Sequence, residues 1–256
     1  MSKKYKIIKN ISIYLLTYFI VNIIIAFLIA IIWETNIESD LHSKSYFWGT
    51  IGSVITLFIY SFLLKKNNSS LLKQCNFGKI NIKTFLYIIV IAIFLSITTE
   101  YFILQLESID IFQNSNSVYY NSKSFLWAIC AIILGPIYEE ILFRGLIYNE
   151  LKKTLNSVAS IIIQALIFAI MHFDFVQIIY TSVLGVFVAL LYTWTKSIIS
   201  SIVAHITFNF FGTYCINYLS NFTNENFYLY AIFSAILFPI SIIFLYKSLK
   251  KNIIPT

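Results

Sequence analysis

Two adjacent carboxylates and a guanidinium interrupt an apolar part of the sequence. Glu139, Glu140 and Arg144 fall in a run of apolar residues that starts near Phe125. A charged side chain at the centre of a bilayer costs about 2.5–3.5 kcal/mol on insertion scales, and the whole chain has only 11 acidic residues. Two of them in one apolar run therefore indicate a function that offsets this cost. Proton transfer to or from a water is one function that such a carboxylate can perform.

Three further polar side chains stand within apolar runs, namely His172, His205 and Asn209. Residues four apart share one face of a helix, so His205 and Asn209 are predicted to point the same way. A carboxylate and two imidazoles at membrane depth are a set of groups that can activate a water molecule. Their occurrence together, on separate apolar runs, favours a hydrolytic site.

The two glutamates are predicted to have different tasks. Glu140 and Arg144 share a helix face, whereas Glu139 lies about 100° round the same helix. Glu140 can therefore neutralise Arg144 along its own helix, which leaves Glu139 facing the interior of the bundle.

Each of these residues also has a purely structural interpretation. Glu140 and Arg144 are also typical of a structural charge pair at the inner end of a helix. His172 at a helix junction is also typical of an interfacial hydrogen-bonding residue, and Asp174 of a helix cap. His205 and Asn209 are also typical of the polar contacts that join membrane helices.

Composition predicts an all-α, polytopic transmembrane bundle. The chain of 256 residues is 59% hydrophobic and 11% charged, whereas soluble domains are about a quarter charged. About 20 apolar residues span a bilayer as a helix, and on that measure about eight spans form a single integral membrane domain over residues 1–256. They are Ile11–Trp33, Phe47–Leu64, Phe85–Ile103, Phe125 into the 135–145 stretch, Val158–Met171, Phe175–Trp194, Ile198–Tyr218 and Phe227–Tyr246.

The basic residues predict that both termini are cytoplasmic. With eight spans and the N-terminus inside, all of the 18 basic residues except Lys44 and Lys123 fall on the cytoplasmic side, as the positive-inside rule requires. The net charge of +7 is then explained by lysines that face anionic membrane lipid. No nucleic-acid partner is expected.

Several other membrane chemistries are excluded by missing motifs. The sequence has no HExxH zinc-protease helix, no GxSxG elbow and no Walker-type glycine loop. Its only aspartates are Asp40, Asp110 and Asp174, which provide no intramembrane aspartate pair. The three cysteines lack CxxC spacing, so neither a disulfide framework nor a cysteine metal site is indicated. A hydrolase that uses glutamate with histidine remains.

Three motifs in order resemble those of the CPBP family of intramembrane endopeptidases. This family includes the type II CAAX prenyl endopeptidases and the bacteriocin-immunity (Abi) proteins. The motifs are Glu139-Glu140-x-x-x-Arg144-Gly145, Phe168-x-x-x-His172 and His205-x-x-x-Asn209. The resemblance covers residues 124–215, which are predicted to form the catalytic core.

The resemblance implies a role for each motif residue. Glu139 with His172 would activate a water for attack on a peptide carbonyl, and His205 with Asn209 would stabilise the oxyanion. Glu140 and Arg144 would support the site.

The resemblance also implies the partners and the location of the protein. No cofactor is expected, and a zinc ion held by Glu139, His172 and His205 is the alternative. The partners would be membrane lipid and a peptide or protein substrate at the membrane, and the location the bacterial plasma membrane. CAAX-type processing, peptide maturation and bacteriocin self-immunity are the roles that the resemblance suggests.

Two other function classes remain open on the sequence. One is a non-catalytic immunity or scaffold protein, whose polar residues hold the bundle together. The other is a proton-coupled transporter, because buried Glu and His also relay protons. At about 1.5 Å per residue, His172 is predicted to lie about 20 Å from the inner end of its helix near Ser157. Glu139 is predicted to lie closer to the inner face, yet a hydrolase needs the two side chains to meet. A water-filled cavity that reaches mid-membrane from the cytoplasm is therefore predicted.

Overall fold

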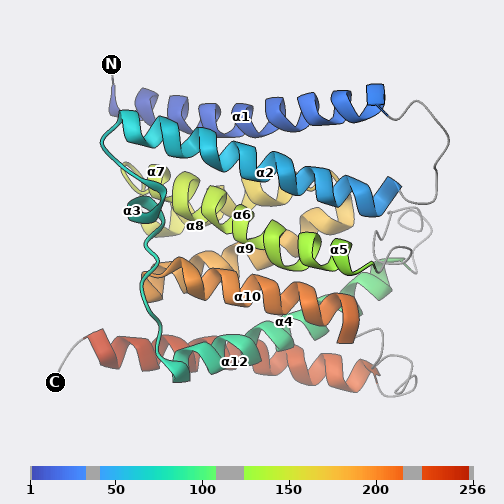
Figure 1. Ribbon diagram of the computed structural model, residues 1–256. Helices are drawn as coiled ribbons and strands as arrows, with labels where there is room; N and C mark the ends of the chain where they lie inside the picture. The colour runs from blue at the N-terminus through green and yellow to red at the C-terminus, as the bar shows by residue number, and fades with distance from the viewer. Residues whose placement is uncertain (1, 33–40, 108–123, 216–226, 254–256) are drawn as a thin grey trace. The chain divides into compact units, whose positions relative to one another are not determined.

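All regular structure in the described part of the chain is helical. The computed structural model describes residues 2–32, 41–107, 124–215 and 227–253. The helices, several of which Figure 1 labels, are α1 (Lys3–Ile32), α2 (Leu41–Lys66), α3 (Leu71–Cys75), α4 (Ile82–Glu107), α5 (Phe125–Ala128), η2 (Ile129–Leu134), α6 (Gly135–Glu140), η3 (Ile141–Tyr148), α7 (Asn149–Leu151), α8 (Ser157–Ile170), α9 (Phe175–Thr195), α10 (Ile198–Phe210), η4 (Phe211–Cys215) and α12 (Phe227–Ile253).

Six helical segments of the described residues are long and apolar enough to cross a membrane. They are Lys3–Ile31, Tyr46–Lys66, Ile82–Leu106, Phe125–Leu151, Phe175–Thr195 and Phe227–Lys250. The other two predicted spans are shorter apolar helices, Ser157–Ile170 and Ile198–Tyr214. With 14 residues, α8 measures about 21 Å, which is less than the hydrocarbon thickness of about 30 Å. The all-helical membrane fold is confirmed, whereas eight crossings and cytoplasmic termini stay predictions.

Large apolar side chains cover the outer faces of the long helices. Ile8 and Phe27 of α1, Phe58 of α2 and Phe244 of α12 are each at least 65% exposed. Many such residues on one soluble protein would form unusually large apolar patches. Here they are the surfaces that contact lipid, and the chain is a multi-pass membrane protein.

The segment that carries the glutamates, Phe125–Leu151, is one helical run in which α-helical and π-helical turns alternate. Ser124 caps its start by accepting a hydrogen bond from the backbone N–H of Trp127 at 3.1 Å. Pro136, near the start of α6, cannot donate to an α-helical ladder. The turn before it, η2, is widened, and the Gly135 N–H donates to the Cys130 carbonyl five residues back. Such π-turns within α-helices often occur at functional sites.

The chain divides into two compact units. The first unit comprises Met1–Phe77 with Val118–Ser160, and the second comprises Gly78–Ser117 with Ile161–Thr256. In the first unit α1 and α2 pack against each other, as Figure 1 shows. The Tyr60 hydroxyl donates to the Tyr14 carbonyl oxygen at 2.7 Å, and the two rings meet edge to face with centroids 5.3 Å apart.

The short helix α3 packs on the π-helical turn η3 of the first unit. A Cβ built on Gly145 would lie 2.3 Å from the Cys75 Sγ atom, so only glycine allows this approach. The Asn149 side chain then donates to the Gln74 carbonyl oxygen at 2.8 Å. Burial raises the pKa of the Cys75 thiol to about 12, so the thiol stays protonated and packs as a small apolar group.

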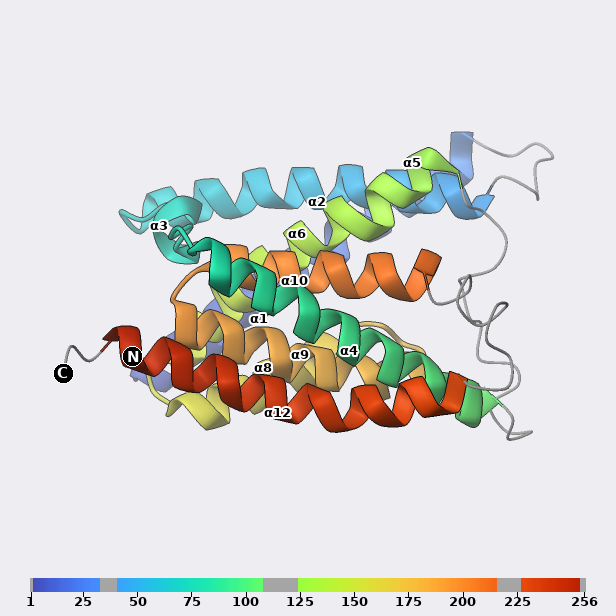
Figure 2. The same cartoon turned by 90° about the horizontal axis from the view of Figure 1, so that it is seen from below.

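The second unit has its apolar core among α4, α9, α10 and α12. Ile88, Leu184, Phe187, Leu191 and Leu245 are among the buried residues of this core. Figures 1 and 2 both show α4 lying along α12 and α10.

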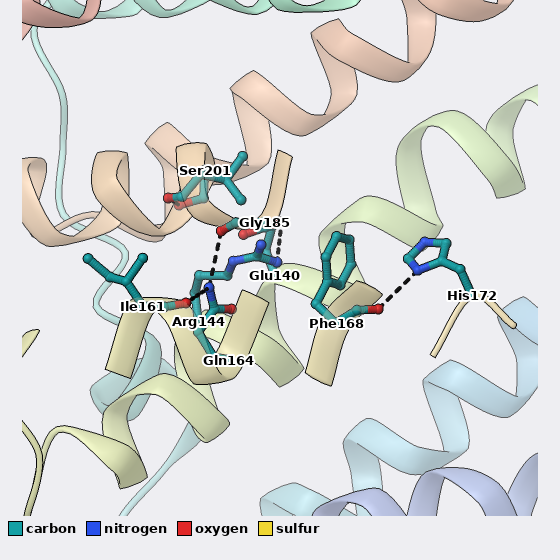
Figure 3. Close-up of polar contacts among 9 residues, drawn as sticks. Glu140, Arg144, Ile161, Gln164, Phe168, His172, Gly185 and Ser201 are labelled. Carbon is teal, nitrogen blue, oxygen red and sulfur yellow. Dashed lines mark hydrogen bonds and ion pairs between the residues drawn. The ribbon is translucent and has the colours of Figure 1, made fainter. Parts of the chain in front are cut away.

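Close backbone approaches join α8, α9 and α10 in the second unit. Gln164 of α8 donates to the Gly185 carbonyl oxygen of α9 at 3.1 Å (Figure 3), and a Cβ on Gly185 would come within 3.1 Å of Ala165. Ser201 of α10 donates to the Val188 carbonyl oxygen of α9 at 2.9 Å. Hydrogen bonds of this kind join helices in membranes, where small residues allow close packing. They fix the two elements that carry His172 and His205.

Candidate active site

Glu140 and Arg144 form the buried ion pair that their spacing predicts. The Arg144 Nη1 atom donates to Glu140 Oε1 at 2.9 Å, and both side chains are fully buried (Figure 3). A charge buried without a partner is strongly destabilising, whereas a hydrogen-bonded partner offsets part of the desolvation cost. The pair holds the turn from α6 into η3, next to Glu139.

Glu139, the neighbour of Glu140 in the sequence, lines a cavity of the first unit. The cavity has a volume of about 260 Å³, and its lining includes Tyr18, Asn22 and Tyr46 from α1 and α2. Glu139 is half-buried, in contrast to the fully buried Glu140. The helical run continues to Leu151, beyond the end that the sequence predicts. Glu139 is therefore near the middle of the run and not near its inner end.

His172 lies in the turn directly after α8. Its Nδ1 atom is 3.0 Å from the carbonyl oxygen of Phe168 (Figure 3). A carbonyl oxygen can only accept, so Nδ1 carries the proton and donates it. In the neutral ring the lone pair is then on Nε2, which can accept a proton from a water. Phe168 lies in the last turn of α8, where side chains often donate to backbone carbonyl groups.

The junction after His172 is held in a strained conformation. Phe173 has a φ of 57°, in the left-handed region that bulky residues rarely adopt. Asp174 then caps α9 by accepting a hydrogen bond from the Gln177 N–H at 2.8 Å, as the cap interpretation predicts. Strained backbone of this kind often accompanies functional sites.

His205 and Asn209 lie four residues apart on α10, in the second unit with His172. His205 is buried, with 3% of its surface exposed. Its ring packs edge to face on Phe168, with centroids 5.8 Å apart, and His172 packs on the same ring at 4.9 Å. The second unit therefore brings both imidazoles around one aromatic ring. Beside Asn209, the Ser96 hydroxyl donates to the Phe208 carbonyl oxygen at 3.1 Å, where α10 gives way to η4.

Each unit thus gathers half of the predicted site. The first unit brings together Glu139, Glu140 and Arg144, and the second brings together the histidines and Asn209. Within neither unit do three His, Cys, Asp or Glu side chains of the described residues gather as metal ligands. The catalytic set and the alternative zinc set both join the two halves, so both stay predictions, as does a single membrane domain with its core at 124–215.

Sequence reasoning assigned no role to the residues of α1 and α2 that line the Glu139 cavity. Tyr18, Asn22 and Tyr46 belong to no motif, and they meet only through the packing of separate helices. One signal was present in the sequence: Asn22 is an amide near the middle of an apolar span. Polar groups at that depth usually face the protein interior.

Comparison with known proteins supports the family assignment. The family described as type II CAAX prenyl endopeptidase Rce1-like matches residues 121–211. The chain is 37% identical to the putative membrane peptidase YdiL of Bacillus subtilis over 86 residues, which are 34% of this chain and 35% of the relative. It is 38% identical to the membrane-embedded CAAX protease MroQ of Staphylococcus aureus over 85 residues, 31% of this chain and 34% of the relative.

These matches cover about a third of each relative's length. No solved structure matches the chain significantly. The matched region, 121–211, nevertheless contains all three motifs, from Glu139 to Asn209. The resemblance inferred from the motifs is therefore confirmed: over residues 121–211 the chain is similar to the Rce1-like type II CAAX prenyl endopeptidase family and to bacterial membrane peptidases.

Proposed function

We propose that this protein is an intramembrane endopeptidase in which Glu139 and His172 activate a water that attacks a peptide carbonyl. The observation that carries the proposal is the hydrogen bond from His172 Nδ1 to the Phe168 carbonyl oxygen at 3.0 Å. It fixes the tautomer with a free lone pair on Nε2, which is the state that a general base needs. Glu139, whose cavity gives room for a water, supplies the negative charge that stabilises the imidazolium formed.

His205 and Asn209 are the proposed donors to the tetrahedral oxyanion. They share a face of α10, and His205 is buried on Phe168 next to His172. A donor aimed at developing negative charge contributes about 10²–10³ in rate. Glu140 and Arg144 act through structure, because their ion pair fixes the helical turn that presents Glu139.

Helix lengths support a meeting of Glu139 with His172. Counted along its own helix, Glu139 is about 18 Å from Leu151, and His172 is about 22 Å from Ser157. Only residues 152–156 connect these two helix ends. These similar lengths support the proposal that the two side chains lie at a similar depth. A cavity open to the cytoplasm is part of the proposal.

Zinc dependence is the alternative form of the mechanism. Glu139, His172 and His205 would hold the ion, and His172 suits this role because its Nδ1–H donates to a backbone carbonyl and leaves Nε2 for a ligand bond. A bound zinc would polarise the peptide carbonyl and lower the pKa of water. Loss of activity in a strong chelator, with recovery on added zinc, would identify this form.

The proposed substrate is a peptide or protein at the membrane, as a protease of this family implies. CAAX-type processing, peptide maturation and bacteriocin self-immunity are the proposed roles. Both termini are proposed to be cytoplasmic, with eight crossings.

The decisive experiment compares Glu139→Gln and His172→Ala with the matched variant Glu100→Gln. Glu100 is also half-buried in a long helix, but it belongs to no motif. In a cleavage assay with a library of membrane-anchored peptides, the first two variants should lose about 10²–10⁴ in rate. Glu100→Gln should keep the parent rate. Parent-like activity or phenotype in both site variants would instead favour the non-catalytic immunity or scaffold protein.

A further inference from the structure

The cavity beside Glu139 is built from three helical segments of the first unit. Tyr18 and Asn22 come from α1, Thr50 and Ser53 from α2, and Glu139 from α6. Its volume of about 260 Å³ is below the 300–1,000 Å³ of pockets for drug-sized ligands. A cavity of this size suits one amino-acid side chain.

Asn22, Thr50 and Ser53 of the lining each donate a proton to their own helix, whereas the tyrosine hydroxyls of the lining can both donate and accept. The Thr50 hydroxyl donates to the Tyr46 carbonyl oxygen at 2.9 Å. The Ser53 hydroxyl donates to the Gly49 carbonyl oxygen at 3.0 Å. A hydroxyl has one proton and two lone pairs, so both residues present only acceptor capacity to the cavity.

The amide of Asn22 also donates to the backbone of its own helix. Its Nδ2 atom donates to the Tyr18 carbonyl oxygen at 2.9 Å. Its Oδ1 atom lies against α2, where a Cβ built on Gly52 would be 2.9 Å away. The amide oxygen, an acceptor, is thus the end that reaches towards α2.

The charge of the lining agrees with this hydrogen-bonding pattern. Glu139 is the charged residue among the described residues that line the cavity, and no lysine or arginine is among them. A hydrocarbon chain in this space would cover acceptor oxygens without supplying donors, which costs free energy. An ammonium or guanidinium group supplies donors and a positive charge, and its hydrogen bonds are the stronger, charge-assisted kind.

We propose that this cavity is a recognition subsite for a lysine or arginine side chain of the substrate, next to the peptide bond that is cut. The position beside the scissile bond rests on the proposed function, since it follows from Glu139 as the group that acts on water. Asn22, Thr50 and Ser53 are then specificity-determining residues, whose oxygens accept the hydrogen bonds of the substrate cation.

Binding to the His172→Ala variant tests the subsite separately from catalysis. This variant keeps Glu139 and the whole lining but lacks the proposed base. The probes are three short peptides that carry lysine, acetyl-lysine or norleucine at one position of the same apolar sequence. The lysine peptide should bind about tenfold tighter than the other two, as charge-assisted hydrogen bonds predict. Adding Thr50→Val and Ser53→Ala should reduce this preference severalfold.

Thr56→Val is the matched control, because Thr56 makes the same bond to the carbonyl four residues back, at 2.7 Å, but does not line the cavity. It should leave the preference unchanged. Equal binding of the three peptides, absent binding, or a preference that survives the double substitution would overturn the subsite. Selective binding with no peptide cleavage by the parent protein would retain the subsite and refute the peptidase function. Cleavage without preference for lysine would support the peptidase function and refute the subsite.

Discussion

At the residue scale, the Glu140–Arg144 pair shows how a membrane helix carries two charges. Both side chains are completely buried and joined at 2.9 Å, so neither charge can be rehydrated where it stands. Loss of either residue would therefore leave the other as a buried charge without its counter-charge, which is strongly destabilising. The adjacent Glu139 differs because a cavity adjoins it.

Removal of one member of the pair should destabilise the fold strongly. Arg144→Met leaves Glu140 buried without its cation, and we expect a loss of about 3–5 kcal/mol in unfolding free energy. The thermal unfolding midpoint in detergent should fall accordingly. The double variant Glu140→Gln with Arg144→Met should recover much of this loss, because no buried charge remains.

Lys153→Met is the control for this prediction. Lys153, in the turn after α7, pairs with Glu150, and 46% of the Lys153 side chain is exposed. Glu150 is buried, but the exposed lysine leaves the pair open to screening by solvent, so the midpoint should move much less than in Arg144→Met. If Arg144→Met and Lys153→Met shift the midpoint equally, the buried pair has no special structural role.

At the element scale, the position of α3 depends on one missing methyl group. The Sγ atom of Cys75 occupies the place where a side chain at Gly145 would begin. Because η3 is a π-helical turn between α6 and α7, displacement of α3 would also disturb the segment that presents Glu139.

Gly145→Ala should destabilise the protein by about 1–3 kcal/mol through overpacking. The loss should be smaller in a Cys75→Ala background, where the clashing sulfur is absent. A double-mutant cycle on thermal unfolding measures this coupling, and residues in direct contact typically couple by 0.5–3 kcal/mol. Additive effects of the two substitutions would show that the contact does not hold α3.

The sequence predicts the long helices and the local pairs, because both depend on neighbours in the chain. Apolar runs mark all eight helices, four-residue spacing predicts Glu140 with Arg144, and Asp174 has the position of a cap. The π-turns, α3 and the residues of α1 and α2 that line the Glu139 cavity were not predicted. These features depend on Pro136 and Gly145 meeting particular partners, and on Asn22 reaching α2, so they arise only from tertiary packing.

At the scale of the whole molecule, the lengths of α8 and α10 decide the membrane topology. If both cross the bilayer, the chain makes eight crossings, and the turn at Lys196 is cytoplasmic. If both short helices stop within the membrane, six crossings remain, and the same turn is external. Both arrangements assume a cytoplasmic N-terminus, and with it the C-terminus is predicted to be cytoplasmic in either case. The positive charge of Lys196 favours the first arrangement.

Labelling of Lys196→Cys in a cysteine-free background distinguishes the two arrangements. Lys196 is exposed in the turn after α9. With eight crossings, a membrane-impermeant maleimide should label it only after the cells are permeabilised. Asn67→Cys, in the exposed turn after α2, should behave in the same way and serves as the cytoplasmic reference. Labelling of Lys196→Cys alone in intact cells would establish six crossings.

Because of the π-helical turn η3, the number of residues between Glu139 and Asn149 matters as well as their types. Glu139 must face the cavity on one side of the run, while Asn149 reaches the Gln74 carbonyl oxygen on another. Deleting one residue between them would leave a continuous helix but rotate everything downstream by about 100°. The wider π-helical turn therefore sets the rotation between the two ends of the run, so that Glu139 faces the cavity and Asn149 reaches α3. Substitutions in 141–148 alter packing locally, whereas an insertion or deletion there changes which face of the helix each later residue occupies.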